Sequence, residues 1–143
     1  MQRPEVGDPL GTWRFDGIRP EALREMAIVL DDPNPIHLDA DVVVALGLGD
    51  RPVNQGPSNV GYVANMLAGL GADATIERLG VRFLANVFAG DVVVAGGTVT
   101  GRTDEPDGSA RIDCDVWLDV EGGGRALEGV AQVLLPAGAG AGR

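Results

Sequence analysis

Residues 55–69 have the sequence QGPSNVGYVANMLAG and carry the strongest indication of the fold. Gly56 and Pro57 are a typical helix start, because proline suits the first helical position and has no N–H to leave unpaired there. Apolar side chains then surround the helix axis almost completely, at Val60, Val63, Ala64, Met66, Leu67 and Leu70. A helix that is apolar on nearly all sides is buried. The stretch therefore predicts a core helix over about residues 57–69.

The elements around this helix are predicted to form an antiparallel sheet. From Thr75 onward apolar residues recur at every second position, which is typical of strands with one buried face. The clearest alternation runs through Ile112, Cys114, Val116, Leu118 and Val120. We expect strands over about residues 75–83, 92–101, 111–120 and 125–135, after a short strand at 12–15 and a helix that opens at Pro20. This order predicts an α+β fold in which the sheet wraps the buried helix.

The length of 143 residues fits one domain, so we expect a single domain over residues 1–143. Met1–Leu10 shows little apolar periodicity, and Ala137–Arg143 consists of alanine and glycine followed by one arginine, so both segments are expected to be flexible. The single cysteine cannot form an internal disulfide, and no apolar run of spanning length or apolar leader is present. The cytoplasm is therefore the expected location.

Charge and composition exclude several classes of function. The net charge is −10, with 21 acidic against 11 basic residues, which opposes binding to nucleic acid or to an acidic membrane. Every basic residue is arginine, so a lysine Schiff base and a Walker-type phosphate loop are excluded. One histidine and one cysteine exclude a zinc site of Cys/His type, and no calcium-loop motif is present, so we expect no metal.

Candidate chemistry is concentrated in the segment DDPNPIH, residues 31–37, which holds the single histidine and two adjacent carboxylates. Each proline fixes its own φ and keeps the residue before it extended, so the loop is rigid. Asn34 and Pro35 favour a turn that would bring His37 back toward Asp32. On local chemistry alone, a purely structural role explains these residues as well as a catalytic site does. In that role the loop ends a helix and the histidine bonds to a backbone carbonyl.

The run Asp32-Pro33-Asn34-Pro35-Ile36-His37, followed by Leu38-Asp39 and later by Asn54-Gln55-Gly56, resembles the hydratase motif of the MaoC-like (R)-specific enoyl-CoA hydratases and dehydratases. The six-residue core is specific, and a weaker likeness runs from about Trp13 to Pro136. The resemblance implies a hot-dog fold and a homodimer or dimer of dimers whose sheets join edge to edge. It implies no cofactor. The acyl substrate would be carried as a thioester on coenzyme A or acyl carrier protein.

The resemblance also implies catalytic roles. The aspartate and histidine that match Asp32 and His37 are the catalytic pair of the family, and would add water to a 2-enoyl thioester or remove it from an (R)-3-hydroxyacyl thioester. Such a reaction needs donors for the oxygen of the developing enolate, and the amino end of the core helix offers them. Gly56 is the natural donor, because it has no side chain and Pro57 has no N–H.

Six further residues are candidates for substrate binding. Asn34, Gln55 and Ser58 lie next to the catalytic candidates in the sequence. Arginine is the only cation available to the phosphates of the carrier, and Arg51, Arg78 and Arg82 are the candidates for that role.

One departure from the family leaves alternatives open, because many relatives have His-Gly where this chain has Gln55-Gly56. A hot-dog acyl thioesterase is one alternative, and a non-catalytic acyl-binding subunit of a heteromeric dehydratase is another. The sequence around Ser58 has no Gly-x-Ser-x-Gly motif, and both Asp32 and His37 are present. These observations favour the hydratase.

Overall fold

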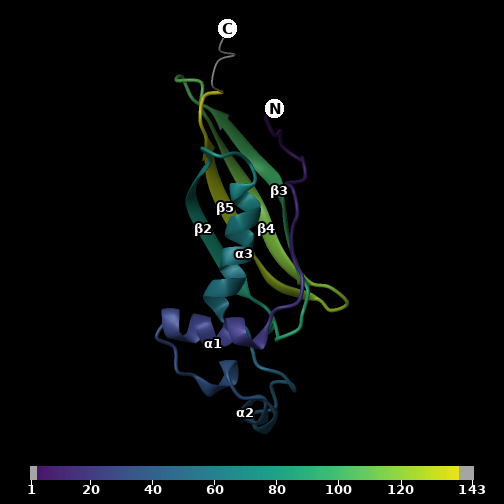
Figure 1. Cartoon of the computed structure of the whole chain (residues 1–143). Helices are drawn as coiled ribbons and strands as arrows, with labels where there is room; N and C mark the ends of the chain where they lie inside the picture. The colour runs from purple at the N-terminus through teal and green to yellow at the C-terminus, as the bar shows by residue number, and fades with distance from the viewer. Residues whose placement is uncertain (1–2, 139–143) are drawn as a thin grey trace.

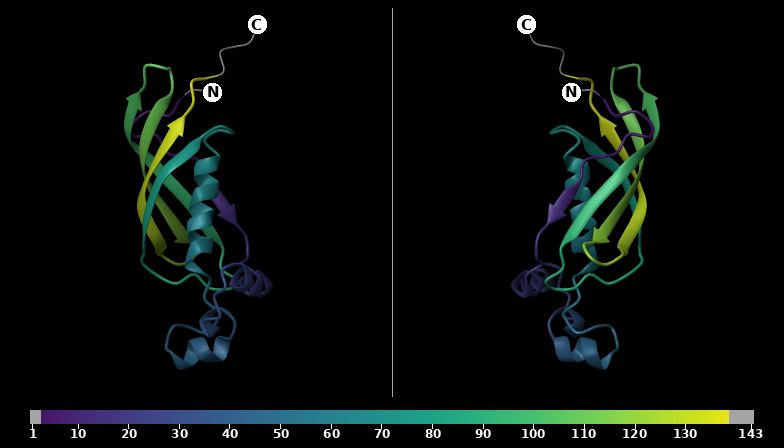
Figure 2. Two further views of the ribbon diagram at one scale, coloured as in Figure 1. Left: turned by 90° about the vertical axis from the view of Figure 1, so that its left-hand side faces the viewer. Right: turned by 90° about the vertical axis from the view of Figure 1, so that its right-hand side faces the viewer.

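A five-stranded antiparallel sheet curves around one helix in the computed structural model, which describes residues 3–138 (Figures 1 and 2). The strands are β1 (Trp13–Phe15), β2 (Thr75–Phe83), β3 (Val93–Asp104), β4 (Ala110–Val120) and β5 (Arg125–Leu135). Their order in the sheet is β1-β3-β4-β5-β2, and every neighbouring pair is antiparallel. The predicted α+β arrangement is confirmed.

The enclosed helix is α3, Gly56–Ala68, and the prediction of a core helix is confirmed. Val63 and Leu67 are fully buried. They belong to a single apolar cluster that includes the inward-facing residues of β4, among them Ile112, Val116 and Leu118. Burial of one aliphatic side chain is worth roughly 1.5–3 kcal/mol, so α3 and the concave face of the sheet stabilise each other.

Phe83 at the end of β2 differs from the predicted pattern. Leu79, Val81 and Phe83 alternate with polar residues, and the alternation predicts that all three share the buried face. Leu79 and Val81 pack against the core, but Phe83 is 53% exposed. The strand ends at Phe83, so its ring reaches beyond the core toward the first residue of α3.

Two further helices and a turn of 3₁₀ helix lie beyond the amino end of α3 (Figure 1). They are α1 (Pro20–Val29), the 3₁₀ turn η1 (Pro35–His37) and α2 (Ala40–Ala45). Pro20 occupies the start of α1, as predicted. Asp39 accepts a hydrogen bond from the backbone N–H of Asp41 and so caps α2. No helix in the described part of the chain is long and apolar enough to cross a membrane.

The segment before β1 is partly held against the sheet. The backbone N–H groups of Gly7 and Leu10 donate to the carbonyls of Val99 (2.9 Å) and Gly97 (2.8 Å), and Leu10 is buried. The sequence predicted flexibility over residues 1–10, but residues 7–10 are held by these bonds. Residues 1–2 and 139–143, which complete the two segments predicted to be flexible, lie outside the described residues.

Candidate active site

The end of α1 places Asp32. Asp31 adopts a left-handed conformation with φ 50°, a conformation that aspartate tolerates better than most residues. The N–H of Asp31 then donates to Ile28 O (3.2 Å) and the N–H of Asp32 to Ala27 O (2.9 Å), which together form a Schellman motif. This motif ends the helix and directs the chain into the loop that carries the candidate residues.

A chain of local hydrogen bonds then shapes the loop from Asp32 to His37. Asp32 Oδ1 accepts from the N–H of Asn34 (3.1 Å), and Asn34 Oδ1 accepts from the N–H of Ile36 (3.2 Å). The second bond caps η1, whose last residue is His37. The predicted turn is therefore present, and the side chain of Asn34 holds the loop.

The structure brings His37 and Asp32 together. His37 Nε2 lies 3.2 Å from Asp32 Oδ2, and His37 Nδ1 lies 2.6 Å from the carbonyl oxygen of Val53. Because a carbonyl can only accept a hydrogen bond, Nδ1 is the donor in the contact with Val53, and Nε2 is the ring nitrogen that faces Asp32. The His37 side chain is only 9% exposed and that of Asp32 is 36% exposed, so solvent reaches the pair mainly at Asp32.

Val53 was not predicted as part of the site. Its N–H also donates to Ile36 O (2.8 Å), and the next residue, Asn54, donates its N–H to Val87 O (2.7 Å). These bonds tie the segment before α3 to the loop on one side and to the core on the other. The Val53 contribution comes from the backbone, which leaves no signal in the residue type.

Gly56, the first residue of α3, lies three residues after Val53. Within residues 3–138 its backbone N–H has no hydrogen-bond acceptor, as expected at the amino end of a helix. A β-carbon on Gly56 would lie 3.1 Å from Cζ of Phe83. The absence of a side chain at residue 56 is therefore what makes room for the Phe83 ring, a contact the sequence pattern did not predict.

Gln55 has a different position from that expected of a substrate-binding residue. The side chain is buried, 1% exposed, and its Nε2 donates to Leu23 O on α1 (2.8 Å). Its Oε1 is fully enclosed and has no hydrogen-bond partner within the described residues. In this structure Gln55 joins α1 to the start of α3, and Ser58, in the first turn of α3, lines a cavity between the same two helices.

Arg51 and Arg82 are both engaged in ion pairs. Arg51 Nη1 donates to Ala89 O (2.7 Å) and to Asp91 Oδ1 (2.9 Å). Arg82 Nη2 lies 2.7 Å from Glu128 Oε1, in a pair that is largely exposed. Each would have to leave its partner to bind a phosphate.

Arg78 is the candidate arginine without such a constraint. It is exposed on β2, and no carboxylate within residues 3–138 lies within ion-pair distance of it. An arginine that keeps its charge uncompensated is better placed to attract an anion than one already paired.

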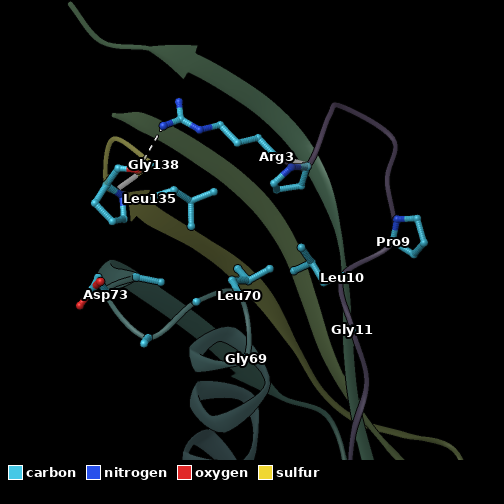
Figure 3. A pocket seen from close by; sticks show the side chains of 14 residues that line it. Arg3, Pro9, Leu10, Gly11, Gly69, Leu70, Asp73, Leu135 and Gly138 are labelled. Atoms are coloured by element: carbon cyan, nitrogen blue, oxygen red, sulfur yellow. Dashed lines mark hydrogen bonds between the residues drawn. The ribbon is translucent and has the colours of Figure 1, made fainter. Parts of the chain in front are cut away.

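A larger cavity of about 380 Å³ lies at the opposite end of α3 (Figure 3). Leu10, Leu70 and Leu135 contribute apolar side chains to it, and Arg3 and Asp73 lie at its margin. Because it adjoins the carboxyl end of α3 and the candidate catalytic pair lies beyond the amino end, this cavity is not part of the candidate active site. Residues 3–138 contain no group of three side chains arranged to hold a metal ion.

Comparisons with known proteins find one matching family and several similar structures. A family model described as a MaoC like domain matches residues 3–113. The (R)-hydratase from A. caviae involved in PHA biosynthesis has a similar structure, with a TM-score of 0.80 and 25% identity over 95% of this chain and 100% of that chain. The unliganded R-hydratase PhaJ1 from Pseudomonas aeruginosa gives a TM-score of 0.79 and 22% identity over 92% of this chain and 82% of that chain.

A chain of the ChsH1–ChsH2 complex from Mycobacterium tuberculosis is also similar, with a TM-score of 0.75 and 23% identity over 92% of this chain and 98% of that chain. A search of curated proteins finds no match. The similar structures therefore include both (R)-hydratases and a chain from a complex of two different subunits.

Proposed function

Since the chain belongs to the MaoC-like domain family and has the predicted hot-dog fold, we propose that it catalyses the (R)-specific hydration of 2-enoyl thioesters and the reverse dehydration of (R)-3-hydroxyacyl thioesters. The observation that supports this most strongly is the pair formed by His37 Nε2 and Asp32 Oδ2, which lie 3.2 Å apart. The His37 side chain is buried and that of Asp32 is partly exposed. An imidazole and a carboxylate at this distance can divide the two proton transfers of a hydration between them.

In the proposed reaction a water molecule binds beside the pair, within hydrogen-bond reach of both Asp32 and His37. One group accepts a proton from the water as its oxygen bonds to C3, and a proton is delivered to C2, so that the elements of water add across the double bond. The Nδ1–H bond to Val53 O fixes the orientation of the ring, so Nε2 faces the water throughout. Dehydration uses the same groups in reverse.

The negative charge that develops on the thioester oxygen needs a donor, and we assign that role to the N–H of Gly56. This N–H has no partner within the described residues, and the helix dipole adds a partial positive charge at the same place. The Phe83 ring lies beside Gly56 and is half exposed, so it can turn outward as the thioester enters.

No cofactor takes part in the proposed reaction, and the acyl group is carried on coenzyme A or acyl carrier protein. Among the candidate arginines we favour Arg78 for the phosphates of the carrier, because Arg51 and Arg82 are paired. A cytoplasmic location is part of the same proposal and is consistent with one buried, unpaired cysteine.

We further propose a homodimer or a dimer of dimers. β2 lies at one edge of the sheet and pairs only with β5 within the described chain, so its outer backbone groups are available to a second copy. The alternative of a non-catalytic subunit is favoured by one observation, the likeness to a chain of the ChsH1–ChsH2 complex.

The assay that tests the proposal follows the loss of the conjugated thioester absorbance of crotonyl-CoA and longer 2-enoyl-CoAs. The hydratase proposal predicts turnover by the purified chain alone, with (R)-3-hydroxyacyl-CoA as the product. Inactivity on all of these substrates, with activity restored by a second chain, would instead support the non-catalytic subunit.

A further inference from the structure

A second cavity, of about 290 Å³, lies between α1 and the first half of α3. Ala22 and Met26 line it from α1, and Asn54, Ser58, Tyr62 and Asn65 line it from the segment that leads into α3 and from α3 itself. Four of these six side chains can form hydrogen bonds, and none of the residues that line the cavity is charged. A cavity of this kind favours an uncharged polar ligand.

The polar side chains at this cavity are only partly satisfied. Asn54 Nδ2 donates to Asn59 Oδ1 (2.8 Å) and to the hydroxyl oxygen of Tyr62 (3.3 Å). Within the described residues nothing donates to Asn54 Oδ1, and nothing accepts from Nδ2 of Asn59, which is bonded to Asn54 but does not line the cavity. Turning both amides over would exchange donors and acceptors but would still leave one end of each without a partner.

Asn54 is deeply buried and also forms part of the cavity wall. Asn54 is 5% exposed, so its side chain is almost completely buried, and yet it lines the cavity. Gln55 Oε1 is the only fully enclosed side-chain oxygen or nitrogen without a partner in the described part of the chain. The unpaired oxygen of Asn54 therefore remains accessible, and a buried polar atom in this state gains free energy from a ligand that bonds to it.

Tyr62 supplies a matching donor. Its ring stacks on Trp13 and Phe15 of β1, with centroids 5.5 Å and 5.3 Å away, so the position of its hydroxyl is fixed. Burial raises the pKa of Tyr62, and the hydroxyl therefore stays protonated at neutral pH. Its oxygen accepts from Asn54, so its hydrogen is free to be donated.

We propose that this cavity binds an uncharged group that both donates and accepts hydrogen bonds, a secondary amide or a hydroxyl, as part of the thioester substrate. Asn54 and Ser58 each lie two residues from Gly56, so a substrate whose carbonyl meets Gly56 N–H can reach the cavity. The group can come from the amides of the pantetheine arm or from an oxygenated acyl chain. The inference rests on the proposed function, because it takes the ligand to be a thioester.

The single tyrosine of the chain allows a direct test. Protein labelled with ¹³C at the tyrosine ζ carbon is titrated with three probes that cannot be hydrated: pantetheine, and the S-methyl thioesters of hexanoic acid and 6-hydroxyhexanoic acid. A saturable shift of the resonance with pantetheine identifies the carrier arm as the ligand. A shift with the hydroxylated thioester alone identifies an oxygenated acyl chain. No shift with any probe, or equal shifts with the two thioesters and none with pantetheine, would overturn the inference.

Two variants link the shift to the cavity. Asn54→Leu keeps the approximate volume and removes the hydrogen bonds, so the affinity for the active probe should fall about fivefold to tenfold. Asn86→Leu, the same change at an exposed asparagine, is the matched control and should leave the affinity unchanged. If Asn54→Leu does not fold, calorimetry on Tyr62→Phe should show a similar loss, and wild-type affinity in the folded variant would contradict the inference.

Failure of this inference can be told apart from failure of the proposed function. Hydration of crotonyl-CoA is measured separately on the wild-type protein. An inactive protein whose tyrosine resonance responds to a probe would contradict the proposed hydratase activity but not the proposed ligand of the cavity. An active protein whose resonance does not respond would remove the cavity from the substrate site and leave the hydratase in place.

Discussion

The Phe83 ring and Gly56 are in direct contact, so closely that a β-carbon on Gly56 would lie 3.1 Å from Phe83 Cζ. The contact joins the last residue of β2 to the first residue of α3. It places a half-exposed ring beside Gly56, whose N–H has no partner within residues 3–138.

Gly56→Ala is therefore expected to separate activity from stability. The added methyl group crowds Phe83 and the path to the N–H, so kcat should fall about 10²-fold, the loss typical of one oxyanion donor. The melting temperature should hold or rise, because alanine favours a helix. Gly11→Ala, where a β-carbon would meet nothing within 4 Å, is the control. Near-normal kcat in Gly56→Ala would remove residue 56 from the site.

Gln55→Met should leave the protein as stable as the wild type or more so. The change keeps a long unbranched side chain, loses one hydrogen bond to Leu23 O and removes the buried Oε1 that has no partner, and these effects of about 1 kcal/mol nearly cancel. Gln55→Glu should instead lower the free energy of unfolding by more than about 2 kcal/mol, because it buries a charge. Urea unfolding measures both, and equal losses would contradict this interpretation.

Arg78→Ala is expected to raise KM more than it lowers kcat, because a phosphate contact is similar in the ground state and the transition state. Arg51→Ala provides the contrast, since Arg51 bonds to Ala89 O and Asp91 and should affect mainly the melting temperature. Steady-state kinetics with crotonyl-CoA and thermal unfolding distinguish the two roles. An unchanged KM in Arg78→Ala would exclude that residue from carrier binding.

Cys114 should be inert toward thiol reagents in the folded protein. Burial, aided by the charges of Asp113 and Asp115, raises the pKa of the Cys114 thiol to about 11. A raised pKa means that the folded state keeps the thiol neutral, so its contribution to stability is complete below the unfolded pKa near 9 and is lost as the pH rises toward 11. At pH 8 a disulfide reagent should react only after denaturant is added, and rapid stoichiometric reaction of the native protein would contradict this.

The sequence was sufficient for most of the fold. The apolar surround of residues 57–69 and the alternation through Ile112 and Leu118 depend on local spacing, and the structure has the helix and the strand in those places. The order of strands in the sheet depends on long-range pairing, which local spacing does not record. The pairing of Leu10 with Gly97 is of the same kind.

The approach of His37 to Asp32 is the part of the candidate site that the sequence predicted best. The prolines of the loop restrict the backbone enough to suggest that His37 turns toward Asp32, and the two lie 3.2 Å apart. The groups that hold them could not be read from residue types, because Val53 contributes a carbonyl and Asp31 a left-handed backbone. The exposure of Phe83 could not be predicted for another reason. Phe83 alternates with polar residues as a buried strand residue does, and yet it is 53% exposed.

We propose that Asp32 and His37 act as one catalytic unit, and kcat measured for Asp32→Asn, for His37→Ala and for the double variant tests this role. Asn at residue 32 can still accept from the N–H of Asn34, so the loop should keep its shape while proton exchange is lost. Each single change should lower kcat by at least about 10²-fold, and Asp41→Asn, an exposed carboxylate on α2, should not.

Groups that act together lose their effects non-additively, so the double variant should be scarcely slower than either single one. Independent groups would instead give a loss equal to the product of the two single losses. The measured kcat values, with melting temperatures to show that each variant folds, decide between these outcomes. A double variant no slower than the singles is the predicted result, and near-normal turnover in Asp32→Asn would contradict the catalytic assignment.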